Sequence, residues 1–306
     1  MRIFTDLDNG SNAGLDREAE RARITANLAG TRAVIAMASA KGGAGKSVIA
    51  VNLAATMALK SRKVGIVDAD LNAPSIVSML GMKPRRGAPY SEGIEPAAGP
   101  HGLRVVASDL LPGGEPQPIA FLDDEAAMAA ATSNHQRPVP LSRTQGLRTM
   151  LAQAQFGTLD LLIIDLPPGV ARLYELAESV RIDGVILVSQ PSEHAERAAR
   201  NSIKLAVANG VPIIGIIENL AGYNCDGCRS MRPLLPAGGI AGLASEFGLP
   251  VLARLSFDPH LAETADRGAL YIREHPDSPT TKAISDMSAV LERWLATRSV
   301  ESQPTS

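Results

Sequence analysis

Seven short runs of valine, isoleucine, leucine and alanine recur along the chain, separated by segments long enough to hold a helix. Runs that are apolar on both faces and alternate with helical segments are typical of a mostly parallel sheet covered on both sides. The chain is therefore predicted to be an α/β protein of three layers, with about seven strands flanked by helices. The runs are AVIAMA (33–38), KVGIVD (63–68), LRVVAS (103–108), LDLLIID (159–165), GVILVS (184–189), VPIIGII (211–217) and PVLARLS (250–256).

The remaining segments set the expected organisation of the chain. The pattern favours one domain over 33–296, between a polar N-terminal extension (1–32) and a C-terminal tail (297–306). Within that domain, a proline-rich excursion at 84–140 surrounds one strand, and a loop at 220–235 contains both cysteines. Helices are predicted at 45–60, 143–155, 192–208, 238–247 and 280–296.

A glycine-rich segment, SAKGGAGKS (39–47), follows the first predicted strand and opens the first predicted helix. Backbone N–H groups of such a turn surround phosphate oxygens, and the helix N-terminus adds partial positive charge. Lys46 is expected to reach the β- and γ-phosphates of ATP, and the Ser47 hydroxyl to bind Mg²⁺. Ala40 replaces the first glycine of the strict pattern, so a turn that merely lets strand and helix pack is the alternative. The order strand, loop, helix favours a P-loop NTPase. The predicted phosphate-loop contacts are Gly42, Gly43, Ala44, Gly45, Lys46, Ser47 and Val48.

Aspartates end two of the predicted strands, VGIVDAD (64–70) and LLIIDLPPG (161–169). Open parallel sheets place their ligands at the carboxyl ends of strands. Asp68 and Asp165 are therefore expected to hold Mg²⁺ with Ser47, and Asp70 to orient the attacking water. Gly169, after two prolines, is expected to sense the γ-phosphate through its amide. A single such aspartate is often only a turn or cap residue.

Lys41 precedes the paired glycines of the phosphate loop. The string KGGAGKS resembles the deviant Walker A loop of the MinD/ParA/Mrp group of P-loop ATPases. In that group the early lysine reaches across a dimer interface to the nucleotide of the partner subunit. The resemblance implies that Lys41 acts in catalysis together with Lys46 and Asp70; a solvated loop lysine is the alternative.

Five further segments resemble, in order and spacing, the Mrp/ApbC family of iron–sulfur cluster carriers. They are DADLNAPS (68–75), LDLLIIDLPPG (159–169), GIIENLAGYNCDGC (215–228), AGGIAGLASEFGLPVLARLSFDP (237–259) and AETADRGA (262–269). The resemblance implies a homodimeric ATPase that carries a [4Fe–4S] cluster to apo iron–sulfur proteins, with slow hydrolysis. It also implies that Asn219 contacts the adenine and that Asp258 and Pro259 line the base pocket. The chain departs from the family where Val170 begins VARL in place of Thr-Gly-Asp, which bears on the rate of hydrolysis.

Cys225 and Cys228 are the only cysteines of the chain. A redox pair favours a helix N-terminus, whereas these residues are expected in a loop. A [4Fe–4S] cluster takes four thiolates, and a structural zinc also takes four ligands. One chain offers two, so a zinc ion or a cluster shared across a dimer fits the count, and the family resemblance favours the cluster. Two unpaired free thiols are the remaining alternative.

The charge and the apolar runs of the chain limit the classes of partner that are expected. A net charge of −2 gives no electrostatic reason to expect nucleic acid. No apolar run approaches the roughly 20 residues that span a bilayer, and the polar first thirty residues do not resemble a signal peptide. The protein is expected to be cytoplasmic, without membrane insertion. A MinD/ParA-type positioning ATPase is the alternative function, and it would need a basic amphipathic helix or a basic surface.

Overall fold

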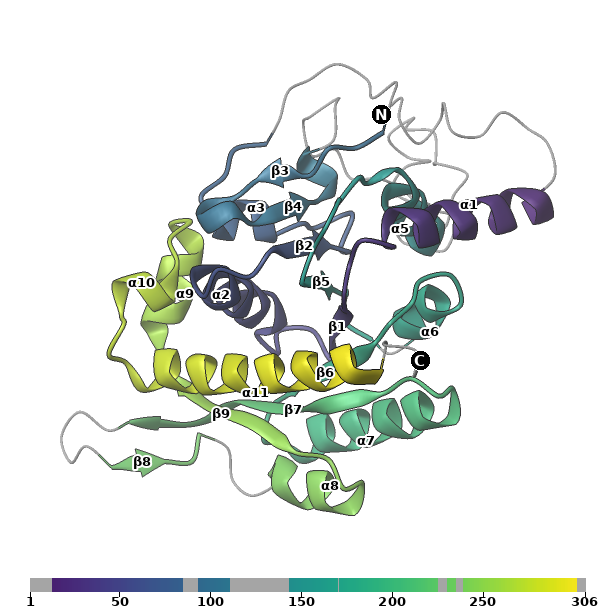
Figure 1. The fold of residues 1–306 in the computed structure, drawn as a ribbon. Coiled ribbons are helices and arrows are strands. Elements are labelled where there is room, and N and C mark those ends of the chain that lie inside the picture. Colours follow the sequence, from purple (N-terminus) through teal and green to yellow (C-terminus); the bar gives the residue numbers. More distant parts are fainter. Residues whose placement is uncertain are drawn as a thin grey trace, which may run out of the picture.

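The computed structural model describes residues 13–84, 93–110, 143–169, 171–224, 230–234 and 239–301. Nine strands within these ranges form one sheet: β1 (Val34–Ser39), β2 (Val64–Asp68), β3 (Ala97–Ala98), β4 (Arg104–Val106), β5 (Leu161–Asp165), β6 (Gly184–Ser189), β7 (Ile213–Asn224), β8 (Met231–Arg232) and β9 (Val251–Phe257). Their spatial order is β3-β4-β2-β5-β1-β6-β7-β8, with β9 also paired to β7 (Figure 1). Only β3 and β8 run antiparallel to their neighbours. The predicted α/β class is confirmed. The two strands that were not predicted, β3 and β8, have two residues each and no apolar run in the sequence indicates them.

Helices cover both faces of this sheet. The described helices are α1 (Ala13–Asn27), α2 (Lys46–Leu59), α3 (Ile76–Met79), α5 (Arg143–Gln153), α6 (Ala171–Ala177), α7 (Glu193–Ala208), α8 (Ile240–Glu246), α9 (Pro259–Asp266), α10 (Tyr271–Glu274) and α11 (Pro279–Glu301), with 3₁₀ turns at Pro100–Gly102 and Ser108–Leu110. One core lies under α1, α5, α6, α7 and α8, and a second lies under α2, α3 and α11. The helical layers on the two faces make the three-layer arrangement that the sequence predicts.

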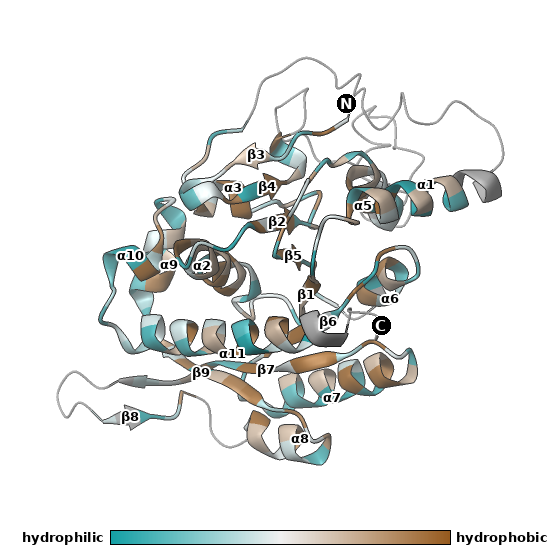
Figure 2. Ribbon diagram, in the orientation of Figure 1, coloured by the Kyte–Doolittle hydropathy of each residue, from teal (hydrophilic) through white to brown (hydrophobic). Residues whose placement is uncertain are grey.

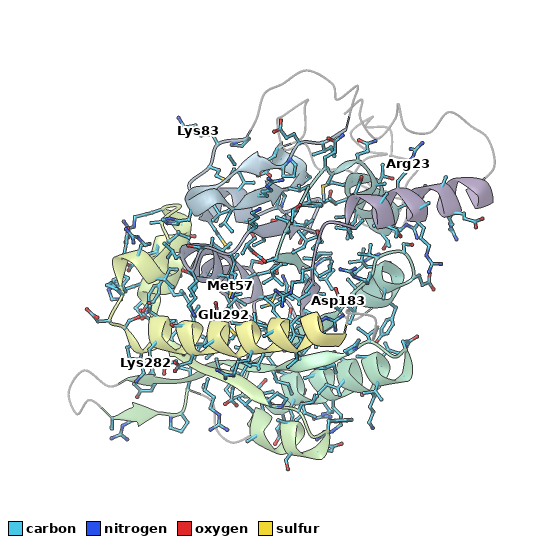
Figure 3. All side chains as sticks on the ribbon, viewed as in Figure 1. Arg23, Met57, Lys83, Asp183, Lys282 and Glu292 are labelled. Atoms are coloured by element: carbon cyan, nitrogen blue, oxygen red, sulfur yellow. The ribbon has the colours of Figure 1, made fainter. Side chains whose placement is uncertain are left out.

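Strand β1 shows how the sequence builds two cores at once. Val34, Ala36 and Ala38 face the α1–α8 side, while Ile35 and Met37 face the α2 side. All six residues of β1 are buried, because successive side chains of a strand point to opposite faces and both faces are covered. The apolar strands and the mixed outer helices stand out in Figure 2. Figure 3 shows Met57 of α2 inside the molecule and Lys83 and Lys282 at its periphery.

A buried carboxylate ties the C-terminal helix to the amino-terminal edge of the sheet. Asp183, directly before β6, accepts the N–H of Val34 at 2.8 Å. Its oxygens also pair with Arg181 at 3.1 Å and with Arg298 of α11 at 2.5 Å. Two arginines and a backbone donor offset the cost of burying the charge. This cluster lies at the opposite edge from the glycine-rich loop and serves the fold.

Helix α1 lies inside the segment that the sequence predicts to be a polar extension. Ile24 is fully buried and Leu28, just after the helix, is 3% exposed, both in the core that α5 shares. Asn27 donates to the carbonyl of Ala152 at 2.8 Å. Residues 18–32 are thus packed onto the domain. At the other end, α11 runs to Glu301, five residues past the predicted helix end.

Strand β7 is longer than predicted and extends into the segment predicted as the cysteine loop. It continues past 217 to Asn224, through Leu220 with a positive φ of 57°. Its register with β9 shifts between Asn219 and Tyr223, as at a β-bulge. Tyr223 and Asn224 then pair antiparallel with β8. The predicted loop at 220–235 therefore begins as one arm of a hairpin. Within the 84–140 excursion, β4 is the predicted strand, and 85–92 and 111–142 lie outside the described residues.

Candidate functional site

The glycine-rich loop joins β1 to α2 at the carboxyl edge of the sheet. Gly43 and Gly45 have φ values of 73° and 79°, a left-handed conformation that L side chains disfavour. Ala44 between them is buried, and α2 begins at Lys46. The loop therefore ends on a helix N-terminus, as a phosphate-binding loop does.

Two amide side chains from neighbouring strands hold the backbone of this loop. Asn219 of β7 donates from Nδ2 to the carbonyl of Ala44 at 2.8 Å. Gln190, which follows β6, donates from Nε2 to the carbonyl of Gly43 at 3.0 Å. A Cβ at Gly45 would lie 2.3 Å from Nδ2 of Asn219. Glycine is thus required there by both its φ and the Asn219 side chain.

Lys46 forms a buried ion pair with Asp165 at the end of β5. The distance from Nζ to Oδ1 is 2.6 Å, and the two side chains are 9% and 2% exposed. The ammonium of Lys46 also donates to the hydroxyl of Ser47 at 3.4 Å. Burial raises the pKa of Asp165, and the charge of Lys46 opposes that rise. A bound triphosphate would offer the ammonium of Lys46 a second anionic partner in the same place.

Asp68 stands beside Asp165, since β2 and β5 pair in register at these two residues. It accepts the N–H groups of Asp70 at 3.0 Å, Ser75 at 2.7 Å and Ile76 at 3.0 Å. Burial, and after it the charge of Asp165, raise the pKa of Asp68 to about 7. Two carboxylates this close disfavour each other's ionisation, and a divalent cation between them would relieve that cost. The donor set of Asp68, Asp165 and Ser47 therefore fits Mg²⁺.

Three further predicted participants, Lys41, Asp70 and Gly169, follow strands at the same edge of the sheet. Asp70 accepts the N–H of Ala73 at 3.2 Å. Lys41 is exposed. The N–H of Gly169, a residue with φ of 102°, donates to the carbonyl of Ser39 at 2.9 Å. Their assigned roles at the attacking water, the partner's nucleotide and the γ-phosphate stay predictions.

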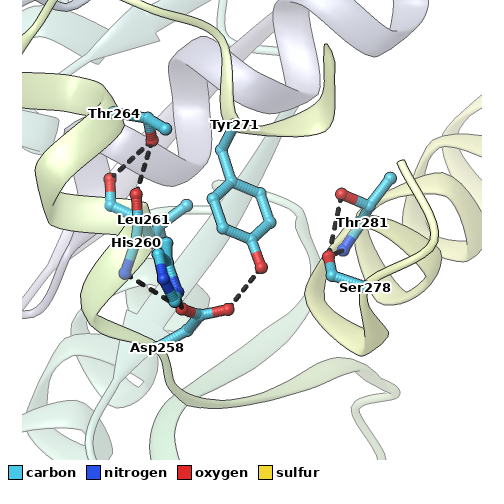
Figure 4. A network of polar contacts seen from close by, with 7 residues as sticks. All are labelled: Asp258, His260, Leu261, Thr264, Tyr271, Ser278 and Thr281. Atoms are coloured by element: carbon cyan, nitrogen blue, oxygen red, sulfur yellow. Dashed lines mark hydrogen bonds and ion pairs between the residues drawn. The ribbon is translucent and has the colours of Figure 1, made fainter. Parts of the chain in front are cut away.

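Asp258 and Pro259, the predicted base contacts, begin α9 directly after β9. Asp258 is the N-cap and accepts the N–H of His260 at 3.0 Å, with Pro259 in the first turn. The second carboxylate oxygen accepts the hydroxyl of the buried Tyr271 (Figure 4). Burial acts to raise the pKa of Asp258, but the hydrogen bonds from Tyr271 and His260 outweigh it and hold the value below 3.8. The carboxylate thus has a capping role; whether the pair also lines a base pocket stays a prediction.

The cysteines lie outside the described residues, at 225–229. The arms that lead to them are described: Tyr223 is in register with Arg232, and Asn224 with Met231. Cys225 therefore directly follows the last residue of the strand that carries Asn219. In the described part of the chain, no three acidic, histidine or cysteine side chains gather as a metal site. No helix there is both long and apolar enough to cross a membrane.

Two residues were not predicted, one that supports the phosphate loop and one that lies next to Asn219 on β7. Gln190 follows a predicted strand at the ligand-binding edge, so the same strand-end argument that selected the aspartates could have found it. Glu218 is 5% exposed and accepts the N–H of Ile240 at 2.9 Å. No local pattern signals that contact, because its partner is 22 residues away.

Comparison with known proteins adds the family. The model described as ParA, NUBPL iron-transfer P-loop NTPase, matches residues 30–291. An iron–sulfur cluster carrier protein of Saccharolobus solfataricus is 34% identical over 251 residues, covering 81% of this chain and 79% of the relative. The cytosolic Fe-S cluster assembly factor Nubp2 homolog of Anopheles gambiae is 30% identical, covering 84% and 95%.

Solved structures of nucleotide-binding proteins share the fold. A nucleotide-binding protein of Archaeoglobus fulgidus in complex with ADP superposes with a TM-score of 0.65 at 25% identity, covering 86% of this chain and 96% of that one. The septum site-determining protein MinD of Pyrococcus horikoshii, complexed with Mg-ADP, gives 0.58 at 21% identity over 88% and 98%, which is a likeness of fold. With the loop, the two strand-end aspartates and the family match in agreement, the chain belongs to the ParA/NUBPL iron-transfer family of P-loop NTPases.

Proposed function

We propose that this protein is an ATP-binding, slowly ATP-hydrolysing carrier that holds a [4Fe–4S] cluster as cargo between two copies of the chain and delivers it to apo-proteins. One observation carries the proposal beyond family membership. Strand β7 supports the phosphate loop through Asn219 and, five residues later, leads from Asn224 into the C-x-x-C segment. A nucleotide and a cluster would thus be held by the two ends of one strand segment.

At the nucleotide, each residue has a distinct task. The loop amides and Lys46 bind the phosphates, while Ser47, Asp68 and Asp165 would hold Mg²⁺. The cation neutralises charge on the β- and γ-phosphates. Asp70 orients the attacking water. Lys41, exposed at the loop, extends to the nucleotide of the partner and offsets charge that develops on the transferred phosphoryl oxygens.

At the cysteines, the number of ligands argues for a dimer. A two-fold axis through the cluster lets Cys225 and Cys228 of each copy supply four thiolates without further residues. Two exposed aromatic residues near the β7–β8 hairpin support a contact surface at this place. Tyr223 and Phe257 lie opposite each other on β7 and β9, and they are 39% and 49% exposed. Exposed large apolar pairs of this kind are common at contact surfaces. A cluster bridging two chains is also readily released, as a carrier requires.

The role as a carrier is tested by transfer. Protein reconstituted with iron and sulfide under anaerobic conditions should restore activity to an apo-enzyme that needs a [4Fe–4S] cluster, faster than free iron and sulfide do. Restoration in the presence of an iron chelator, to which free iron is lost, shows direct delivery. Equal rates for protein and free ions would reject the carrier role. Sedimentation of the protein with vesicles or DNA in an ATP-dependent manner would instead favour a positioning ATPase.

A further inference from the structure

Glu218 is a buried acid that the proposed mechanism leaves unused. Its side chain is 7% exposed, in the middle of β7. Oε1 accepts the N–H of Ile240 at 2.9 Å, and Oε2 pairs with Nε of Arg254 on β9 at 3.2 Å. Burying a carboxylate is costly unless it is paired and hydrogen-bonded. Both carboxylate oxygens have partners, so the position of the Glu218 side chain against Ile240 is well defined.

The next residue, Asn219, reaches the opposite face of the sheet. Successive side chains of a strand point to opposite faces. Asn219 accordingly contacts Ala44 in the phosphate loop, on the α2 side, whereas Glu218 contacts the first residue of α8, on the other side. Because α8 has no side-chain N-cap, the first N–H of the helix finds its partner in Glu218. Two adjacent residues thus join the phosphate loop to the start of α8.

The chain between these anchors is the hairpin. After Asn219, strand β7 passes Leu220 with its positive φ of 57° and continues along Tyr223 and Asn224, which pair with β8. Strand β8 is the returning arm, and α8 begins later in the chain at Ile240. Asn219 therefore fixes the outgoing end of the hairpin segment, and Glu218 fixes the returning end.

We propose that Glu218 is a positioning residue that transmits nucleotide occupancy from the phosphate loop to the start of α8, which follows the β7–β8 hairpin in the chain. When the amides of the loop close on phosphate, the carbonyl of Ala44 is fixed, and with it Asn219 and the β7 backbone between the two anchors. Glu218 then holds Ile240, the first residue of α8, more firmly. The coupling is the difference between these hydrogen bonds in the nucleotide-bound and nucleotide-free states. This inference rests on nucleotide binding as proposed above and does not require the cluster.

Hydrogen exchange on the whole chain, prepared without iron or sulfide, tests the coupling. In the unsubstituted chain, MgATP should slow exchange in peptides covering the phosphate loop, the arms at Tyr223 and Arg232, and the start of α8. In Glu218→Ala the phosphate loop should still respond, while the response at α8 is lost. The amide of Ile240 should also exchange about tenfold faster without nucleotide, because a hydrogen bond to a charged group is worth about that factor in an opening equilibrium.

Matched variants separate positioning from general stability. Glu218→Gln keeps an acceptor for Ile240 and should retain most of the response. Glu246→Ala removes an exposed acid of α8 that pairs with Arg200, and it should behave as the unsubstituted chain. Where Glu218→Ala fails to fold, as exchange across β1 and β5 would reveal, Glu218→Leu fills the site without an acceptor.

Three results would overturn the inference. The first is an α8 response in Glu218→Ala or Glu218→Leu equal to that of the unsubstituted chain. The second is protection of the phosphate loop in the unsubstituted chain with no change at the hairpin arms or α8. The third, no MgATP protection at the phosphate loop, would remove nucleotide binding itself and so reject the proposed function as well.

Discussion

Raising the pH from 4 to 8 should destabilise the metal-free protein in part through the buried carboxyl group of Asp68. Its pKa is about 7 in the folded chain, against 3.8 as its ordinary value. Between these values the unfolded chain loses a proton that the folded chain keeps, so rising pH favours unfolding. The loss begins near pH 4 and is complete just above pH 7. The difference between the two pKa values corresponds to about 4 kcal/mol in the free energy of unfolding.

The comparison variant is Asp68→Asn, which has a similar shape and does not titrate. In Asp68→Asn, the amide NH₂ replaces one of the two carboxylate oxygens and faces backbone N–H groups that had donated to that oxygen. The variant therefore loses hydrogen bonds, and its free energy of unfolding is lower by a constant amount at every pH. The informative quantity is therefore the pH dependence of the difference between the two proteins. Urea unfolding at pH 4, 5, 6, 7 and 8 without Mg²⁺ should show the unsubstituted protein losing about 4 kcal/mol relative to Asp68→Asn.

Two further measurements identify the cause. In Asp165→Asn the charge that helps to raise the pKa of Asp68 is gone, so the pH-dependent loss should shrink and move to lower pH. Saturating MgADP should also reduce the loss, because a cation beside Asp68 favours its ionised form. Parallel stability curves for the unsubstituted protein and Asp68→Asn between pH 4 and 8 would refute the reasoning, and with it the argument that this pair of carboxylates is poised for a cation.

The remaining predictions concern the nucleotide. Lys46→Ala should weaken MgATP binding by about a hundredfold or more in calorimetry, since Lys46 is buried at the end of the loop whereas Lys41 is exposed; undiminished affinity would contradict the site. Gly45→Ala should lower the free energy of unfolding by more than about 2 kcal/mol, because strain at positive φ adds to a 2.3 Å approach to Asn219. Gly43→Ala, with open space around it, should cost only about 1 kcal/mol; equal losses would argue against the buttressing role of Asn219. Lys41→Ala and Asp70→Ala should each abolish hydrolysis and keep binding, and mixing the two variants should restore turnover in heterodimers. No recovery, with mixed dimers shown to form, would contradict action of Lys41 in trans.

The sequence predicts the sheet well because each central strand is apolar on both faces and needs no distant partner to be recognised. The first and last residues of strands such as β5 and β6 lie within two residues of the predicted bounds. Strand β7 was predicted too short, since Glu218, Asn219 and Asn224 look like loop residues. Their backbone nevertheless continues the sheet with β8 and β9, and the first two side chains find partners across the fold.

Helix α1 was missed for a related reason. Its larger side chains are mostly charged or polar, and Ile24, with Leu28 just beyond the helix, supplies the deeply buried contact with the domain. Asp258 shows the limit of assigning roles by motif. The sequence Asp-Pro-His carries a helix-start signal, a cap residue followed by proline, and the structure uses it as one. The network around Asp258 depends on Tyr271, which no local pattern connects to it.

The most direct test of the account is the content of iron and sulfide in protein reconstituted without oxygen. The account predicts about four iron and four sulfide per dimer, a brown chromophore, and a dimer in solution. Cys225→Ser or Cys228→Ser should abolish all iron binding while MgATP still binds, which shows that the two sites are separate. Stoichiometric zinc in protein purified without oxygen, with no chromophore after reconstitution and no iron retained, would contradict the account and leave a zinc-linked ATPase dimer.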